Sequence, residues 1–108
     1  MNDVMEQLYQ TIASRKEEPV ENSYTNYLFS QGLDKICKKI GEECAETIIA
    51  AKNGDPAPLT GEAADVLYHL LVLLCERGVP WDHVRDELER RAQKIGNKKV
   101  FHDADRDS

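Results

Sequence analysis

Residues 33 to 77 read LDKICKKIGEECAETIIAAKNGDPAPLTGEAADVLYHLLVLLCER, and this stretch decides the fold. Its first half repeats apolar side chains on one helical face, which consists of Leu33, Ile36, Cys37, Ile40, Cys44, Ile48 and Ala51. Gly54 is a typical helix stop, and Asp55-Pro56 is a typical start for the next helix. The stretch therefore predicts two long helices, over residues 33–53 and 56–77, whose short connection favours antiparallel packing.

The second of these helices is apolar on almost every side between Val66 and Cys75. A helix of this kind has to be surrounded by other elements. One or two neighbouring helices of the same chain would hardly enclose it. We therefore expect a homodimer that shares a helical bundle.

Shorter helices are expected on both sides of the hairpin. One covers residues 2–18 and ends at Pro19, and another covers residues 23–31, with Ser23 as its N-cap and Gly32 as its stop. A charged helix with a narrow apolar stripe begins near Pro80, and a polar tail that frays is expected from about residue 102. The predicted fold is all-α, with four to five helices in one domain spanning residues 1–108.

Composition excludes several classes of protein. A net charge of -6 and a pI near 5.0 argue against a broad basic surface, so no nucleic-acid partner is expected. The longest strongly apolar run is too short to cross a bilayer, so no membrane partner is expected. The three cysteines form neither a CxxC pair nor an even disulfide set, which favours a reduced cytoplasmic protein with small core cysteines.

Acidic residues cluster at two places in the hairpin. Glu43 and Glu46 are three residues apart, as are Glu62 and Asp65, so each pair projects from one helical face. Both pairs lie near the loop, where antiparallel helices would bring four carboxylates together. Like charges at close range repel, and Mg²⁺ resolves this conflict because it prefers oxygen ligands. The bland alternative is a set of solvated surface acids, which are common in a chain with 20 acidic residues.

Helical angles separate the roles of the acids. At about 100° per residue, Glu43 borders the apolar stripe and Glu46 lies about 60° further round. Glu42 points nearly opposite the core. Glu43 and Glu46 are therefore the expected inner ligands, and Glu42 is expected in an outer role.

Basic and aromatic residues flank the acidic cluster. Lys35 and Lys39 extend the side of the helix that bears Glu43, where they would bind substrate phosphates or simply pair with nearby glutamates. His69 continues the face of Glu62 and Asp65, either as a hydrogen-bonded interior residue or as one that orients a metal ligand. Three tyrosines would stack on a base or serve in the core or an interface: Tyr24, Tyr27 and Tyr68.

The acidic pattern is EExxE, a fifteen-residue spacer and ExxD, and it resembles the MazG-like all-α nucleotide pyrophosphohydrolases. The wider match is to the phosphoribosyl-ATP pyrophosphohydrolase family. It runs over roughly residues 3–92 and includes the segments SYT (23–25), GLDKI (32–36), KIGEE (39–43), TIIAAK (47–52) and ADVLYHL (64–70).

The resemblance implies a dimer, Mg²⁺ dependence and hydrolysis of phosphoribosyl-ATP to phosphoribosyl-AMP and pyrophosphate in histidine biosynthesis. It implies Glu43, Glu46, Glu62 and Asp65 as metal ligands and a metal-activated water as the nucleophile. Glu42 or an inner carboxylate would accept the water's proton. A separate cyclohydrolase would take the product. The chain departs from the family at residues 94–99, KIGNKK, which leaves any substrate contact there open.

Two other functions fit parts of the pattern. A house-cleaning pyrophosphohydrolase of non-canonical nucleoside triphosphates would use the same ligands. A helical interaction module would leave the carboxylates solvated, and titration with Mg²⁺ would then show no defined stoichiometry.

Overall fold

The computed structural model describes residues 3–96 and places them in five α-helices. Their bounds are α1 (Val4–Glu17), α2 (Tyr24–Gln31), α3 (Leu33–Asn53), α4 (Pro56–Glu76) and α5 (Trp81–Gly96). Over the described residues the all-α prediction is confirmed, and each predicted helix is found within two residues of its expected ends. The expected fraying from residue 102 lies outside the described residues.

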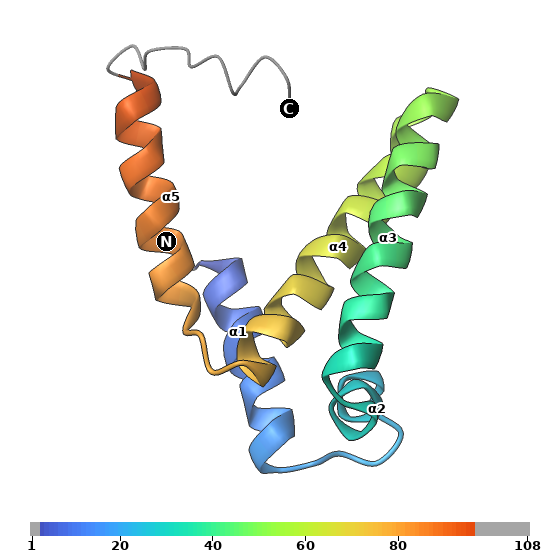
Figure 1. Cartoon of the computed structure of the whole chain (residues 1–108), viewed down its shortest axis with the longest axis vertical. Coiled ribbons are helices and arrows are strands. Elements are labelled where there is room, and N and C mark those ends of the chain that lie inside the picture. Colours follow the sequence, from blue (N-terminus) through green and yellow to red (C-terminus); the bar gives the residue numbers. More distant parts are fainter. Residues whose placement is uncertain (1–2, 97–108) are drawn as a thin grey trace.

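The long helices α3 and α4 form an antiparallel hairpin (Figure 1). Gly54 ends α3 with a φ of 82°, in the left-handed region that glycine adopts without steric cost. The Asp55 side chain then accepts a hydrogen bond from the Ala57 amide at 3.1 Å, and Pro56 occupies the first turn of α4. This tight connection sets the register in which the two helices face each other.

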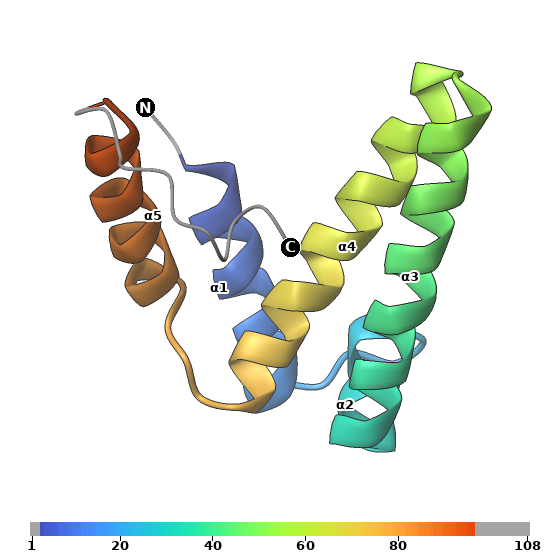
Figure 2. The same cartoon turned by 45° about the horizontal axis from the view of Figure 1, so that its top comes forward.

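The hydrophobic core lies toward the end of the hairpin that is remote from this connection. Its fully buried members come from four helices: Ile12, Leu28, Ile36, Leu71 and Val72. Helix α1 packs on α4, and α2 packs on α3, while α5 leans away from the hairpin and contacts α1 (Figures 1 and 2). Two hydrogen bonds hold the α5 end: the Tyr9 hydroxyl donates to the Val79 carbonyl at 2.9 Å, and the Trp81 indole donates to Asp3 at 3.4 Å.

Several apolar side chains of the hairpin are exposed in the single chain. Ile48 is 65% exposed and Leu67 is 48% exposed. The expectation that all cysteines are core residues is wrong, because Cys37 and Cys44 are exposed and only Cys75 is partly buried. Helix α4 is long and apolar enough to cross a membrane by composition, a test that core helices of soluble proteins also pass. It carries Glu62, Asp65 and His69 near its middle.

Candidate functional site

Three carboxylates meet between the two long helices. Glu43 is on α3, and Glu62 and Asp65 are on α4. Each offers one carboxylate oxygen, and the three oxygens lie within 4.8 Å of one another. The antiparallel hairpin brings residue 43 opposite residues 62 and 65, as the short connection predicted. These three residues are called the carboxylate cluster below.

Two members of the carboxylate cluster are buried at a cost in the protein alone. Glu43 is only 8% exposed and Glu62 is partly buried, whereas Asp65 is exposed. One oxygen of each, Oε2, is buried and has no hydrogen-bond partner among the described residues. A buried acceptor without a partner loses the hydrogen bonds that water would provide. The cluster therefore has unused acceptor capacity on Glu43 and Glu62.

The same crowding changes the acidity of Glu62. Desolvation, together with the neighbouring carboxyls of Glu46 and Glu43, raises the pKa of Glu62 from 4.5 to about 7. Glu46 is exposed and lies outside the carboxylate cluster, but it interacts with Glu62 across the helix pair. The structure thus brings three of the four expected ligands together and places the fourth beside them.

Lys39 lies at the edge of the carboxylate cluster. Its Nζ lies 3.8 Å from Glu43 Oε1 and 4.0 Å from Glu42 Oε2. Glu42 itself is exposed, one residue along the helix from the buried Glu43. Burial separates Glu43 from Glu42, but it does not separate Glu42 from Glu46, because both of these are exposed.

Two hydrogen bonds connect the Asp65 backbone to His69 and His69 to Tyr24. His69 is buried, and its Nδ1 lies 2.7 Å from the Asp65 backbone carbonyl, which can only accept, so Nδ1 carries the hydrogen. His69 Nε2 then accepts from the Tyr24 hydroxyl at 3.0 Å. The sequence singled out both side chains, but no spacing signal connects residue 24 with residue 69. Only the packing of α2 against α4 brings them into contact.

The basic C-terminal region lies apart from the carboxylate cluster in its contacts. Arg90 and Arg91 both pair with Glu87 on the same helix. This is the behaviour of a solvated helix surface. Residues 97–99, the second half of the segment KIGNKK, lie outside the described residues.

An oxygen-only donor set with two unpaired buried oxygens is suited to a hard divalent cation. The described residues place no histidine or cysteine ligand atom in this set. Lys39 adds a positive charge beside the carboxylates.

Comparison with known proteins agrees with this chemistry. The sequence profile described as "Phosphoribosyl-ATP pyrophosphohydrolase" matches residues 5–92. A "Phosphoribosyl-ATP pyrophosphatase" of Clostridium novyi is 53% identical over 97 residues, which cover 90% of this chain and 88% of that protein. A protein of the same name from Lactiplantibacillus plantarum is 55% identical over 95 residues, covering 88% of this chain and 90% of that one.

A third relative is longer. The "Histidine biosynthesis bifunctional protein HisIE" of Lactococcus lactis is 50% identical over 101 residues, which cover 94% of this chain and 48% of that protein. The match to the family profile covers most of the chain, including the whole of α2, α3 and α4. The chain belongs to the phosphoribosyl-ATP pyrophosphohydrolase family.

Proposed function

We propose that this chain hydrolyses phosphoribosyl-ATP to phosphoribosyl-AMP and pyrophosphate, a step of histidine biosynthesis. Family membership supports the substrate, because the curated relatives carry the name of this activity. The observation that carries the chemistry is the convergence of Glu43, Glu62 and Asp65, with two buried oxygens left unpaired. The proposed location is the cytoplasm, and a separate cyclohydrolase is the proposed consumer of the product.

The proposed cofactor is Mg²⁺, with Glu43, Glu46, Glu62 and Asp65 as its protein ligands. The donor set fits, since all four side chains offer carboxylate oxygens and the unpaired acceptors need a cation. When bound, Mg²⁺ would neutralise phosphate charge and lower the pKa of water.

The chain's own residues then orient the substrate and handle the proton. Lys39, 3.8 Å from Glu43, lies where it balances the charge of a phosphate next to the carboxylates. Lys35, one turn before it on α3, is the second proposed phosphate ligand. Glu42 is exposed beside the cluster and accepts the proton of the attacking water. His69 holds the backbone of Asp65 in place through its 2.7 Å hydrogen bond.

The test is a comparison of substrates. Pyrophosphate release is measured with Mg²⁺ for phosphoribosyl-ATP and for a panel of canonical and modified nucleoside triphosphates. We expect the highest kcat/KM with phosphoribosyl-ATP, and no turnover by a folded Glu62→Gln variant. A higher kcat/KM with a modified nucleoside triphosphate would instead identify a house-cleaning enzyme. Absence of stoichiometric Mg²⁺ binding by calorimetry would favour the non-catalytic interaction module.

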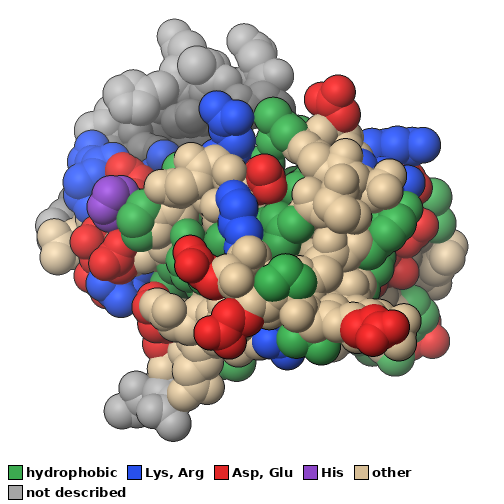
Figure 3. All heavy atoms as spheres, turned by 90° about the horizontal axis from the view of Figure 1, so that it is seen from below, with side chains coloured by type: hydrophobic (Ala, Val, Ile, Leu, Met, Phe, Trp, Pro, Cys, Tyr) green, Lys and Arg blue, Asp and Glu red, His purple; other side chains and the backbone are tan. Residues whose placement is uncertain are grey.

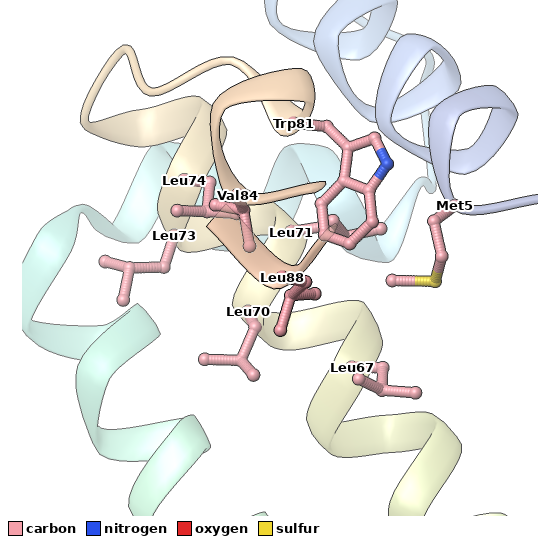
Figure 4. A pocket seen from close by; sticks show the side chains of 9 residues that line it. All are labelled: Met5, Leu67, Leu70, Leu71, Leu73, Leu74, Trp81, Val84 and Leu88. Carbon is pink, nitrogen blue, oxygen red and sulfur yellow. The ribbon is translucent and has the colours of Figure 1, made fainter. Parts of the chain in front are cut away.

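A homodimer is the proposed assembly, and the apolar surface of the hairpin supports it. A cavity of about 280 Å³ between α1, α4 and α5 is lined by the nine apolar side chains in Figure 4. A groove on α3 and α4 is lined by Cys44, Thr47, Ile48, Ala63, Val66 and Leu67. Leu67 lines both, so the two hollows meet at this residue.

A second copy of this chain is the occupant that fits this surface. This surface brings several apolar side chains together, whereas exposed leucines on most proteins are scattered singly. Helix α4, whose sequence requires neighbours, supplies the largest share of these side chains. Another face of the molecule mixes acidic, basic and apolar side chains (Figure 3). Sedimentation at micromolar concentration measures the assembly directly, and a folded monomer would refute the proposal.

A further inference from the structure

Two tyrosines of α2, Tyr24 and Tyr27, are partly exposed in the single chain. The rings of Tyr24 and Tyr27 on α2 stack with centroids 6.0 Å apart and planes inclined by 25°. Tyr24 is 45% exposed and Tyr27 is 44% exposed, so neither ring is a core residue of the described chain. An aromatic surface of this kind can stack on a nucleobase, because every base presents a π-face.

Tyr24 is held rigidly relative to the carboxylates. Its hydroxyl donates to His69 Nε2 at 3.0 Å, and His69 Nδ1 donates to the Asp65 carbonyl at 2.7 Å. The His69 ring also meets the Tyr24 ring edge-on at 5.7 Å. Tyr24 is therefore linked through His69 to the backbone of Asp65, although it comes from a different helix.

The two lysines near this pair differ in their partners. Lys39 is drawn toward the carboxylates, with Nζ 4.0 Å or less from both Glu42 and Glu43. Lys35 has no ion pair with a described residue, and its Nζ lies 6.0 Å from the centre of the Tyr27 ring. Four residues correspond to about 6 Å along a helix. The order along the surface is thus the carboxylate cluster, then Lys39 and Tyr24, then Tyr27 and Lys35.

The proposed substrate has groups in a matching order. Because the phosphoribosyl group remains on phosphoribosyl-AMP when pyrophosphate leaves, it is attached to the nucleoside half of the molecule. With the phosphoribosyl group on the base, the substrate carries a triphosphate at one end, the base in the middle and an additional ribose phosphate beyond. ATP lacks that last phosphate.

We propose that Tyr24 and Tyr27 stack on the base and that Lys35 binds the phosphate of the phosphoribosyl group. Lys39 then serves the triphosphate end, beside the carboxylates. In this arrangement Lys35 is the residue that distinguishes phosphoribosyl-ATP from ATP. The inference rests on the proposed function and assigns the substrate's parts to places on the same site.

The test separates the two ends of the substrate. KM and kcat are measured for phosphoribosyl-ATP, and ATP is measured as a competitive inhibitor, for the natural chain and for Lys35→Gln. The matched control is Lys38→Gln, an exposed lysine on the same helix. Lys35→Gln is expected to raise KM for phosphoribosyl-ATP by roughly ten- to a hundredfold, with kcat and the ATP inhibition constant unchanged. Lys38→Gln is expected to change neither constant.

Two results would overturn the assignment of Lys35. One is an equal weakening of phosphoribosyl-ATP and ATP, which would place Lys35 at the triphosphate. The other is a KM no different from that of Lys38→Gln. The natural chain separates this from failure of the proposed function: without pyrophosphate release from phosphoribosyl-ATP, the activity itself is refuted, and the inference falls with it.

Stacking on Tyr27 is tested by comparing a variant that removes the aromatic ring with one that keeps it. Tyr27→Leu removes the ring and is expected to weaken both phosphoribosyl-ATP and ATP by roughly five- to a hundredfold. Tyr27→Phe keeps the π-face and is expected to recover most of the loss. If Tyr27→Phe were as weak as Tyr27→Leu, the hydroxyl rather than the ring would be the relevant group, and stacking would be refuted.

Discussion

Glu43 and Glu62 are expected to destabilise the protein when no cation is bound. Each has a buried oxygen with no partner among residues 3–96, and desolvation together with the neighbouring carboxyls raises the pKa of Glu62 to about 7. Natural proteins keep such an arrangement at binding sites, because a bound ligand provides the partners that the buried carboxylates lack in the protein alone. The two residues therefore allow sharp tests of the proposed Mg²⁺ site.

Stability without metal should depend on pH through Glu62. Its folded pKa, about 7, is above the ordinary 4.5, so the folded state holds this proton more tightly. The unfolding free energy should therefore fall as pH rises from about 5 to 8. Glu62→Gln should remove that part of the fall, and Mg²⁺ should stabilise the natural chain more at pH 8 than at pH 5. Urea unfolding in chelator at both pH values measures this, and parallel pH dependences in the two proteins would contradict it.

Glu42 and Glu43 should differ in their effect on the metal. Glu43 is 8% exposed within the carboxylate cluster, whereas Glu42 is exposed beside it. Glu42→Gln should lower kcat roughly a hundredfold or more, the usual contribution of a general base, with little change in the Mg²⁺ requirement. Glu43→Gln should lower activity and also raise the Mg²⁺ concentration needed. Activity across a Mg²⁺ titration compares them, and equal shifts for both would make Glu42 a direct ligand.

At the scale of the elements, the buried face of α3 differs from the face that its apolar stripe predicts. Its buried residues are Ile36, Glu43 and Ala50, spaced by seven. At about 100° per residue this face lies roughly a quarter turn from the centre of the apolar stripe. Glu43 is thus at the centre of the buried face rather than at its border. The remaining stripe, including Ile48, is left for the proposed second copy.

The connection between α3 and α4 should be sensitive to a single methyl group. Gly54 has a φ of 82°, a conformation that costs other residues about 1–2 kcal/mol. Gly54→Ala should lower the unfolding free energy by about that amount. Gly61→Ala is the control, because its added Cβ meets nothing within 4 Å inside α4, and it should stabilise by about 0.5–1 kcal/mol. Chemical unfolding measures both, and the same sign for the two variants would contradict the turn geometry.

At the scale of the whole molecule, the proposed dimer accounts for surface that the single chain leaves exposed. The cavity beside α5 and the groove on the hairpin share Leu67, which is 48% exposed. A second copy on this surface would enclose α4. It would leave uncovered the hydrogen bonds that join Tyr24, His69 and Asp65, which lie on the opposite edge of that helix. Assembly and catalysis would then use different faces of the hairpin.

A charge at Leu67 should separate the copies. Leu67→Arg would bury an unpaired charge in the proposed interface, and should raise the dimer dissociation constant roughly a hundredfold or more. Val20→Arg is the matched control, because Val20 is similarly exposed but lies between α1 and α2. Sedimentation over a range of concentrations measures both. Unchanged association in Leu67→Arg, with the helical fold intact, would place the interface elsewhere.

The amino-acid sequence by itself determined the helices and the spacing of the acids. The caps at Ser23 and Asp55 and the stop at Gly54 act between residues a few positions apart, and α3 begins and ends where its pattern predicts. The tertiary structure decided which face of α3 is buried, and it alone joined Tyr24 to His69. These features depend on contacts between distant segments, and helical periodicity contains no information about which neighbour covers which face.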